Sequence, residues 1–152
     1  MAFRIMTVCT ANICRSPVAQ VFLSRALQNL PVQVHSAGTL AINGNYADQT
    51  MQFLLRDKGY PNIEDHRSQA LMPSLIGKYD LLLCMEDSHL HWITQRSPIA
   101  TAKVKLLGHW DNKRQVSDPI GQERSEYERS VEEIEHLSSL WANKLIDLGV
   151  CV

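Results

Sequence analysis

The sequence predicts an α/β protein of the three-layer, doubly wound class, in which helices flank a central four-stranded parallel sheet. Segments with strand and helix patterns alternate along the chain, the order that gives parallel strands joined by helical crossovers. The run 79–85 is almost continuously apolar, as in a strand covered on both faces. The 152 residues suit one domain, and we expect a single domain over 1–152.

The first strand and the first helix are expected on either side of a short loop. Residues 3–8 form a β-prone run. We expect Ser16 to cap the following helix, with Pro17 in its first turn, where a missing N–H costs no hydrogen bond. Apolar side chains recur at helical spacing at Ala19, Phe22, Leu23, Ala26 and Leu30. Pro31 then stops the helix.

The middle of the chain predicts a strand, a loop and two helices. Residues 32–37 form a second strand candidate, and the stretch 39–46, with two Asn and a Gly, indicates a loop. A helix is expected over 47–58 with Gly59 as its C-terminal stop. A shorter helix is expected within 68–76.

The second half adds two strands and a long helix. The third and fourth strands are predicted at 79–85 and 103–107. In the last helix, Ser125 and Glu128 have the spacing of a capping box and Gly149 lies past the end. A stripe with a 4-3 repeat runs along it: Tyr127, Val131, Ile134, Ser138, Trp141, Leu145 and Leu148. This stripe predicts a helix packed on the sheet.

Composition excludes several classes of protein. The formal net charge is −1, which gives no electrostatic basis for binding nucleic acid or an anionic membrane. No apolar run approaches the roughly 20 residues of a membrane-spanning helix. Four cysteines without an export signal indicate reduced thiols and a cytoplasmic location. Any bound anion must therefore be held by a locally shaped site.

The segment Cys9–Ser16 has the composition of such a site. In parallel sheets, ligands bind beyond the carboxyl ends of strands, where Cys9 is expected. A tight loop before a helix turns backbone N–H groups toward an anion, and the helix N-terminus adds positive charge. Arg15 supplies a planar fork for two phosphate oxygens, and the same fields favour a thiolate at Cys9. The segment therefore predicts a phosphate-binding loop with a nucleophile.

The run Val8-Cys9-Thr10-Ala11-Asn12-Ile13-Cys14-Arg15-Ser16-Pro17 resembles the signature of the low-molecular-weight protein tyrosine phosphatases. Further matches are Ser36-Ala37-Gly38-Thr39, Asp65-His66-Arg67, the run 79–86, Leu106-Leu107-Gly108 and Asp118-Pro119. The tract Gly108-His109-Trp110-Asp111 is similar to bacterial members linked to polysaccharide export, whose targets are tyrosine autokinases.

The resemblance implies phosphotyrosine hydrolysis without a cofactor or metal, through a cysteinyl-phosphate. Cys9 would be the nucleophile and Arg15 the phosphate clamp. Ser16 would donate a hydrogen bond to the thiolate. Asn12 would hold the loop's shape because Asn tolerates a left-handed conformation, and His66 would brace it or be a plain surface histidine. The other loop residues would surround the phosphate: Thr10, Ala11, Ile13 and Cys14.

Asp118 would be the general acid that gives the phenolate leaving group a proton, with Pro119 stiffening its loop. We expect a bell-shaped rate profile with Cys9 on the acid limb and Asp118 on the basic limb. Leu40, Tyr46 and Ile120 are expected at the pocket rim, where some members of the family have aromatic residues.

Two further expectations concern the loop itself. Cys14 would form a reversible disulfide with Cys9, or serve only as a small buried side chain. Ala11 replaces the usual glycine, and we expect a working loop with weaker phosphate binding. The partner would be a phosphotyrosine protein, and the chain a monomer or weak dimer that inserts into no membrane.

Two other functions remain open at this point. An arsenate reductase of the same architecture needs a relay of cysteines; Cys84 is near one relay position, but His91 stands where the next cysteine would be. A phosphotyrosine-binding module without turnover would have no use for an acid at Asp118. The pair His89 and His91, two residues apart, faces different sides of a helix and predicts no metal site.

Overall fold

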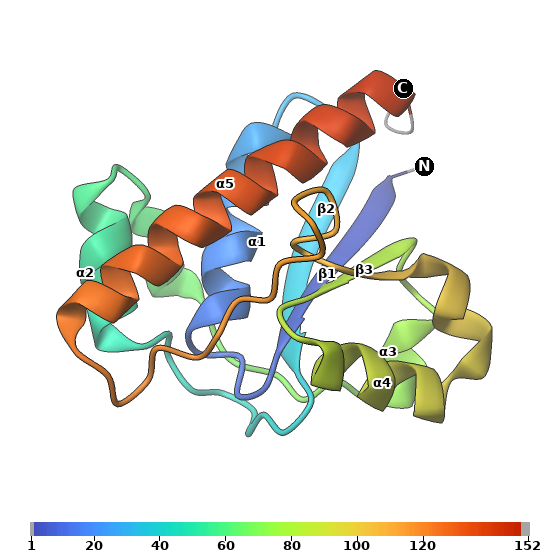
Figure 1. Ribbon diagram of the computed structural model, residues 1–152, viewed down its shortest axis with the longest axis horizontal. Helices are drawn as coiled ribbons and strands as arrows, with labels where there is room; N and C mark the ends of the chain where they lie inside the picture. Colours follow the sequence, from blue (N-terminus) through green and yellow to red (C-terminus); the bar gives the residue numbers. More distant parts are fainter. Residues whose placement is uncertain (1, 150–152) are drawn as a thin grey trace.

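The computed structural model describes residues 2–149, which form a four-stranded sheet between two layers of helices (Figure 1). The strands are β1 Phe3–Cys9, β2 Val32–Gly38, β3 Leu81–Cys84 and β4 Val104–Leu106. All pairings are parallel and the order is β2-β1-β3-β4. The predicted fold class is confirmed. Of the four cysteines, Cys151 lies outside the described residues.

The helices divide between the two faces of the sheet. The bounds are α1 Arg15–Ala26, α2 Gln49–Asp57, α3 Pro73–Ile76, α4 Asp87–Arg96 and α5 Arg124–Leu148, with 3-10 helices η1 Pro61–Asp65 and η2 Pro98–Lys103. Helices α1 and α5 cover one face, with α2 packed beside them, and α3 and α4 lie on the other (Figure 1).

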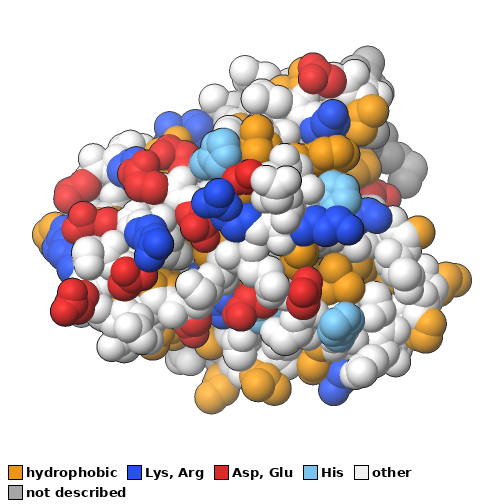
Figure 2. Space-filling view, viewed as in Figure 1, with side chains coloured by type: hydrophobic (Ala, Val, Ile, Leu, Met, Phe, Trp, Pro, Cys, Tyr) orange, Lys and Arg blue, Asp and Glu red, His pale blue; other side chains and the backbone are white. Residues whose placement is uncertain are grey.

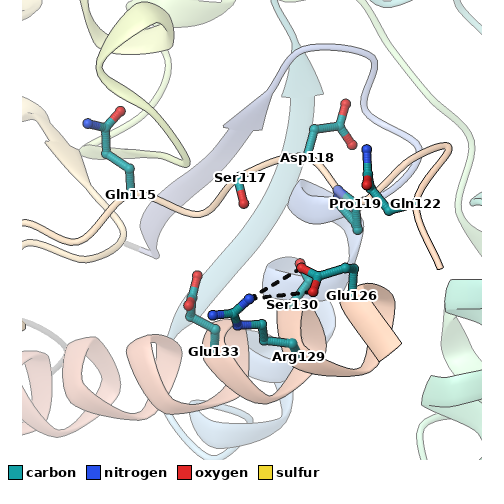
Figure 3. A pocket seen from close by; sticks show the side chains of 9 residues that line it. All are labelled: Gln115, Ser117, Asp118, Pro119, Gln122, Glu126, Arg129, Ser130 and Glu133. Carbon is teal, nitrogen blue, oxygen red and sulfur yellow. Dashed lines mark hydrogen bonds and ion pairs between the residues drawn. The ribbon is translucent and has the colours of Figure 1, made fainter. Parts of the chain in front are cut away.

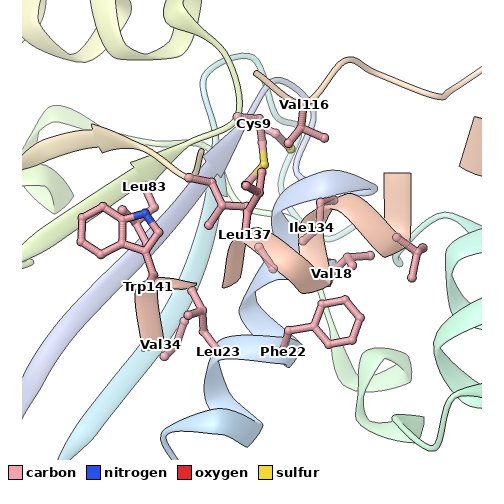
Figure 4. Close-up of a cluster of buried hydrophobic side chains, with 14 of the residues drawn as sticks. Cys9, Val18, Phe22, Leu23, Val34, Leu83, Val116, Ile134, Leu137 and Trp141 are labelled. Atoms are coloured by element: carbon pink, nitrogen blue, oxygen red, sulfur yellow. The ribbon is translucent and has the colours of Figure 1, made fainter. Parts of the chain in front are cut away.

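The larger apolar core lies between the sheet and the pair α1 and α5 (Figure 4). Phe22 of α1 and Leu137 of α5 are buried there, and Trp141 donates from Nε1 to the Leu106 carbonyl at 3.2 Å. Burial of side chains of this size stabilises a fold by about 1.5–3 kcal/mol each. Cys9 is part of the same cluster, so the packing that holds α1 also holds the loop before it.

The start of α1 differs from the expectation for Ser16. Cys14 occupies the N-cap position without a side-chain cap, and Ser16 lies in the first turn. The Ser16 hydroxyl instead contacts Cys9 and Asn12, so tertiary partners have taken the group that would cap the helix. The helix also ends earlier than expected, at Ala26.

Helix α5 begins at Arg124 with Glu123 at the N-cap, so Ser125 lies inside the first turn and the predicted capping box with Glu128 does not form. Gly149, at φ 68°, ends the helix as expected. The predicted stripe is buried as far as Leu145, and Leu148 is exposed.

The segment 68–76 is helical only over Pro73–Ile76, because its first part extends along the sheet in a bridge between Gly38 and Ala70. Helix α4 was not expected. Its sequence has no Ser, Thr or Asn at the N-cap; Glu86 and His89 form a reciprocal capping box instead.

The strand order reverses beside β1, which places β2 on one side of it and β3 on the other. Cys9 is the last residue of β1 and therefore lies at this switch point.

Acidic and basic side chains are interspersed over α2 and α5 (Figure 2). Within residues 2–149, no helix has the length and apolar character needed to cross a membrane.

Candidate active site

The loop between β1 and α1 curls around a small hollow. Cys9 is 2% exposed at the end of β1, and Asn12 has φ 59°, in the left-handed region that Asn tolerates. The hollow is lined by Cys9, Ala11, Asn12, Ile13, Cys14, Arg15, Asp118 and Ile120. Ala11 has no positive φ, so its methyl group adds no left-handed strain; whether it weakens phosphate binding stays a prediction.

The Ser16 hydroxyl lies between Asn12 and the Cys9 sulfur. Asn12 donates from Nδ2 to Ser16 Oγ at 2.8 Å, and Cys9 Sγ lies 3.0 Å from the same oxygen. The amide fills one acceptor site of the hydroxyl, and a Cys9 thiolate, which can only accept, receives the serine proton. A hydrogen bond donated to sulfur favours its ionised form.

The orientation of the Asn12 amide is in turn fixed by the main chain of Gln69. The N–H of Gln69 donates to Asn12 Oδ1 at 2.9 Å, which directs Nδ2 to Ser16 and, at 3.0 Å, to Ser36. His66 donates from Nε2 to the Asn12 carbonyl at 2.6 Å. Burial lowers the pKa of His66, which keeps the ring neutral.

Several of these supporting residues escape sequence reasoning. Ser36 accepts from Asn12 and donates to Gln20 Oε1 at 2.6 Å, and Gln69 donates from Nε2 to the Ser36 carbonyl. Ser36 falls in a short family match, but its partner could not be inferred. Gln20 lies one helical turn after Ser16 in α1, and this spacing is its only sequence feature that points to the site.

Arg15 is 2% exposed, and its charge is compensated by contacts from two distant segments. Nη1 donates to Glu86 Oε2 at 2.5 Å and to the Val116 carbonyl at 2.8 Å. Glu86 follows the end of β3, at the same sheet edge as the loop. These two bonds fix the plane of the guanidinium against the hollow, as recognition of a planar pair of oxygens requires.

The segment after Val116 brings Asp118 to the hollow. The carboxylate is 46% exposed, with Oδ2 3.9 Å from Arg15 Nη2, and Oδ1 accepts from the Ile120 N–H at 3.1 Å. Pro119 is buried between them. Gly121, at φ 83°, completes the turn. Asp118 and Cys9 therefore line the same hollow.

The predicted rim residues separate into two groups. Ile120 is 39% exposed and lines the hollow. Leu40 and Tyr46, 73% and 63% exposed, belong to the neighbouring segment 39–46 and do not line it. Leu40 donates its N–H to the Thr10 carbonyl at 2.9 Å, and the Tyr46 ring lies 3.8 Å from the Arg67 guanidinium.

Gly38 packs directly against the loop. A Cβ at this position would collide with the Thr10 carbonyl oxygen and lie 2.9 Å from the Asn12 nitrogen. Only glycine allows this approach of two backbones.

A larger groove of about 410 Å³ lies beside the hollow and borders Asp118 and Pro119 but not Cys9 (Figure 3). Its other wall is α5, where Arg129 pairs with Glu126 at 3.4 Å. The groove lies next to the candidate acid and away from the thiol.

Within the described residues, no group of three His, Cys, Asp or Glu side chains is arranged to hold a metal ion. Burial raises the pKa of the Cys14 and Cys84 thiols well above the usual range, so both are protonated.

Comparison with known proteins gives one consistent family. The family described as "Low molecular weight phosphotyrosine protein phosphatase" matches residues 4–147. The chain is 33% identical over 141 residues to the "Probable low molecular weight protein-tyrosine-phosphatase AmsI" of Erwinia amylovora, covering 93% of this chain and 96% of the relative. It is 34% identical over 141 residues to Wzb of Escherichia coli K12, covering 93% and 94%.

Solved structures agree with this result. Vibrio vulnificus Wzb in complex with benzylphosphonate superposes with a TM-score of 0.89 at 32% identity, over 95% of this chain and 100% of that one. The YwlE arginine phosphatase from Geobacillus stearothermophilus gives 0.88 at 32% identity, over 97% and 96%. The bacterial relatives agree with the subgroup that the tract 108–111 indicated. The chain belongs to the low-molecular-weight protein tyrosine phosphatase family.

Proposed function

We propose that this phosphatase hydrolyses phosphotyrosine in two steps through a cysteinyl-phosphate on Cys9. One observation carries the proposal: Cys9 Sγ lies 3.0 Å from the Ser16 hydroxyl, which can donate to a thiolate, and Cys9 lines a hollow together with Arg15 and Asp118. A stabilised thiolate, a buried guanidinium and an acid are the groups that phosphate-ester cleavage requires.

In the first step, Cys9 Sγ attacks phosphorus and the bond from phosphorus to the phenolic oxygen breaks. Arg15 and the loop N–H groups hold the equatorial oxygens, whose spread charge they stabilise in the transition state. Asp118, protonated, gives its proton to the departing tyrosine oxygen.

In the second step, water attacks the cysteinyl-phosphate. Asp118, now a carboxylate, takes a proton from the water as the sulfur–phosphorus bond breaks and inorganic phosphate forms. Ser16 donates to the departing sulfur in this step as in the resting site, which makes the thiolate a better leaving group.

The partner in this proposal is a tyrosine autokinase of polysaccharide synthesis or export. Its support is the similarity to Wzb and AmsI and the tract Gly108–Asp111. A trapping experiment tests it: Cys9→Ser on a resin should retain the tyrosine-phosphorylated kinase, and free vanadate should release it. Retention of an unphosphorylated kinase to the same extent would contradict the proposal.

The chemistry is tested by hydrolysis of p-nitrophenyl phosphate and of a phosphotyrosine peptide. Cys9→Ser should abolish both activities, whereas Cys84→Ala, which also removes a thiol, should retain them. Binding of the peptide without any hydrolysis by the wild type would indicate a recognition module, and thiol-dependent arsenate turnover would indicate a reductase. Because the structural neighbours include YwlE arginine phosphatases, a phosphoarginine peptide belongs in the same assay. Preferred hydrolysis of that peptide would overturn the tyrosine assignment.

We also propose that Cys14 protects the nucleophile. Hydrogen peroxide would oxidise the Cys9 thiolate to a sulfenic acid, and the Cys14 sulfur would then displace water to give a disulfide. After mild peroxide treatment, mass spectrometry should find a bridged peptide of Cys9 and Cys14, and dithiothreitol should restore activity. A Cys9 sulfinic acid as the main product would refute this role.

A further inference from the structure

His89 is a buried ionisable group that the proposed chemistry does not use. It is 2% exposed, and its ring reaches the phosphate-binding loop, with Nε2 2.8 Å from Thr10 Oγ1. Its neighbour on the same helix, His91, is exposed. We propose that His89 is a positioning residue of the phosphatase site, which fixes the first turn of the loop by donating a hydrogen bond to the Thr10 hydroxyl. This inference rests on the proposed function of the loop.

The direction of that hydrogen bond follows from the other ring nitrogen. The backbone N–H of Glu86 lies 3.1 Å from His89 Nδ1. A backbone N–H can only donate, so Nδ1 is the acceptor and the single proton of the neutral ring is on Nε2. His89 therefore donates and Thr10 Oγ1 accepts.

The charges around His89 preserve this arrangement. Arg15, Glu86 and Asp118 are the charged groups that influence the pKa of the ring. Burial, followed by the charge of Arg15, lowers the pKa of His89 to about 4, so the ring is neutral at pH 7. Protonation would put a second N–H at Nδ1, against the Glu86 N–H that it accepts in the neutral state.

The hydrogen bond between His89 and Thr10 matters because Glu86, the other residue of the same capping box, also contacts the loop. Glu86 is the N-cap of α4 and binds Arg15, while His89, at the third position of that helix, binds Thr10. Both ends of the loop are thereby bonded to one helix N-terminus. The separation between the first loop N–H groups and the guanidinium is thus set by α4, and not by the loop alone.

Two substitutions of His89 separate its two hydrogen bonds. In His89→Asn, the amide oxygen replaces Nδ1 as acceptor for Glu86, but the donor to Thr10 is lost. In His89→Gln, the amide nitrogen reaches the position of Nε2 and keeps that donor. We expect His89→Asn to weaken binding of inorganic phosphate, measured by calorimetry, and kcat/KM on p-nitrophenyl phosphate, each by about tenfold. His89→Gln should recover most of both losses.

Substitutions of Thr10 test the same bond from the other side. Thr10→Val should reproduce the loss of His89→Asn, and Thr10→Ser, which keeps the hydroxyl, should not. The double variant Thr10→Val with His89→Asn should be no worse than the poorer single variant, because one bond is removed in both cases. His91→Asn, an exposed histidine on the same helix, should match the wild type.

A purely structural role predicts a different outcome. In that case the melting temperature of His89→Asn would fall while the phosphate affinity of its folded fraction stayed at the wild-type value, or the double variant would show the product of the single losses. Either result would overturn the proposal. If His89→Asn does not fold, the comparison of Thr10→Val with Thr10→Ser decides. Phosphate binding needs no turnover, so a wild type that bound phosphate without hydrolysis would refute the proposed function and still test His89.

Discussion

The Arg15 side chain is almost entirely buried. Its charge is compensated by Glu86 and the Val116 carbonyl. A buried ion pair contributes little net stability, but removal of one partner leaves an uncompensated charge. The Glu86 carboxylate thus acts at the site through Arg15. Asp118 differs, because its side chain is 46% exposed.

Replacing Asp118 with Asn tests its role through the leaving group. On a phosphotyrosine peptide, kcat should fall by about 100-fold or more, the usual contribution of a general acid. On p-nitrophenyl phosphate the loss should be clearly smaller, because p-nitrophenolate leaves without a proton. The basic limb of the pH–rate profile should also disappear.

The matched control is Asp57→Asn, an exposed carboxylate at the end of α2. It should leave both rates unchanged. Equal losses on the two substrates in Asp118→Asn would mean that the carboxylate acts on binding or on the loop and does not supply the proton.

The sequence identified the loop residues because their types report their chemistry: a thiol, a guanidinium and an Asn that accepts a left-handed backbone. It could not identify Glu86, Gln69 or His89. Glu86 follows the third predicted strand, Gln69 lies in a segment predicted to be helical, and His89 lies in no predicted element. Only the tertiary fold brings these polar residues against the site. Tertiary contacts also explain why Ser16 does not cap the helix, because its hydroxyl contacts Cys9 and Asn12 instead.

Among the elements, β2 and the β1–α1 loop are joined by a backbone contact that leaves no room for a side chain. Gly38 ends β2 opposite Cys9 in the parallel register, and the loop carbonyl of Thr10 lies over it. The sequence predicted both elements but not this approach, because a glycine after a strand also suits an ordinary turn.

Gly38→Ala should therefore displace the loop. We expect a loss of about 1–3 kcal/mol in the free energy of unfolding, as for overpacked interiors, measured by urea denaturation. Since the clash is with loop backbone, kcat/KM should fall as well in the folded fraction. Gly77→Ala is the control, because Gly77 has φ −68° and open space around its Cα. It should be neutral or slightly stabilising. An active, equally stable Gly38→Ala would show that the loop relaxes freely.

Helix α4 shows where reasoning about elements failed. Its residues 87–96 include two histidines, a Trp and few strong apolar repeats, and its cap is a Glu. The capping box satisfies its first N–H groups with side chains that also contact Arg15 and Thr10. Contacts with the site thus stabilise the helix, and the sequence pattern of residues 87–96 alone does not reveal them.

At the scale of the whole molecule, the predicted parallel sheet and its switch point were correct because alternating strands and helices restrict the topology strongly. Burial in the folded protein also changes the pKa of several histidines. Burial lowers the pKa of His35, His66 and His89, and for His89 the value is about 4.

Stability should therefore fall in mild acid. The ordinary pKa of His89 is 6.5, so between pH 6.5 and about 4 the unfolded chain binds the proton that the native ring refuses. The contribution is fully retained above pH 6.5 and is lost as the pH falls toward 4, by up to about 3 kcal/mol for this residue. Urea unfolding at pH 7 and at pH 4.5 measures the loss.

Carboxylates also titrate in this range, so the comparison between variants isolates the histidine. His89→Asn should show a smaller loss of unfolding free energy between the two pH values than the wild type. His91→Asn should show the wild-type loss. If all three lost the same amount, the native His89 would be protonated as readily as in the unfolded chain.

The main-chain N–H of Gln69, 57 residues from Asn12, orients the Asn12 amide, which donates to the Ser16 hydroxyl beside Cys9 Sγ. The chemical character of the thiol is consequently a property of the assembled chain, absent from any fragment that contains only the loop. Alkylation of Cys9 can therefore report on folding: its rate constant during refolding should reach the native value only when the segment around Gln69 docks. A peptide of residues 1–30 should react like a simple thiol.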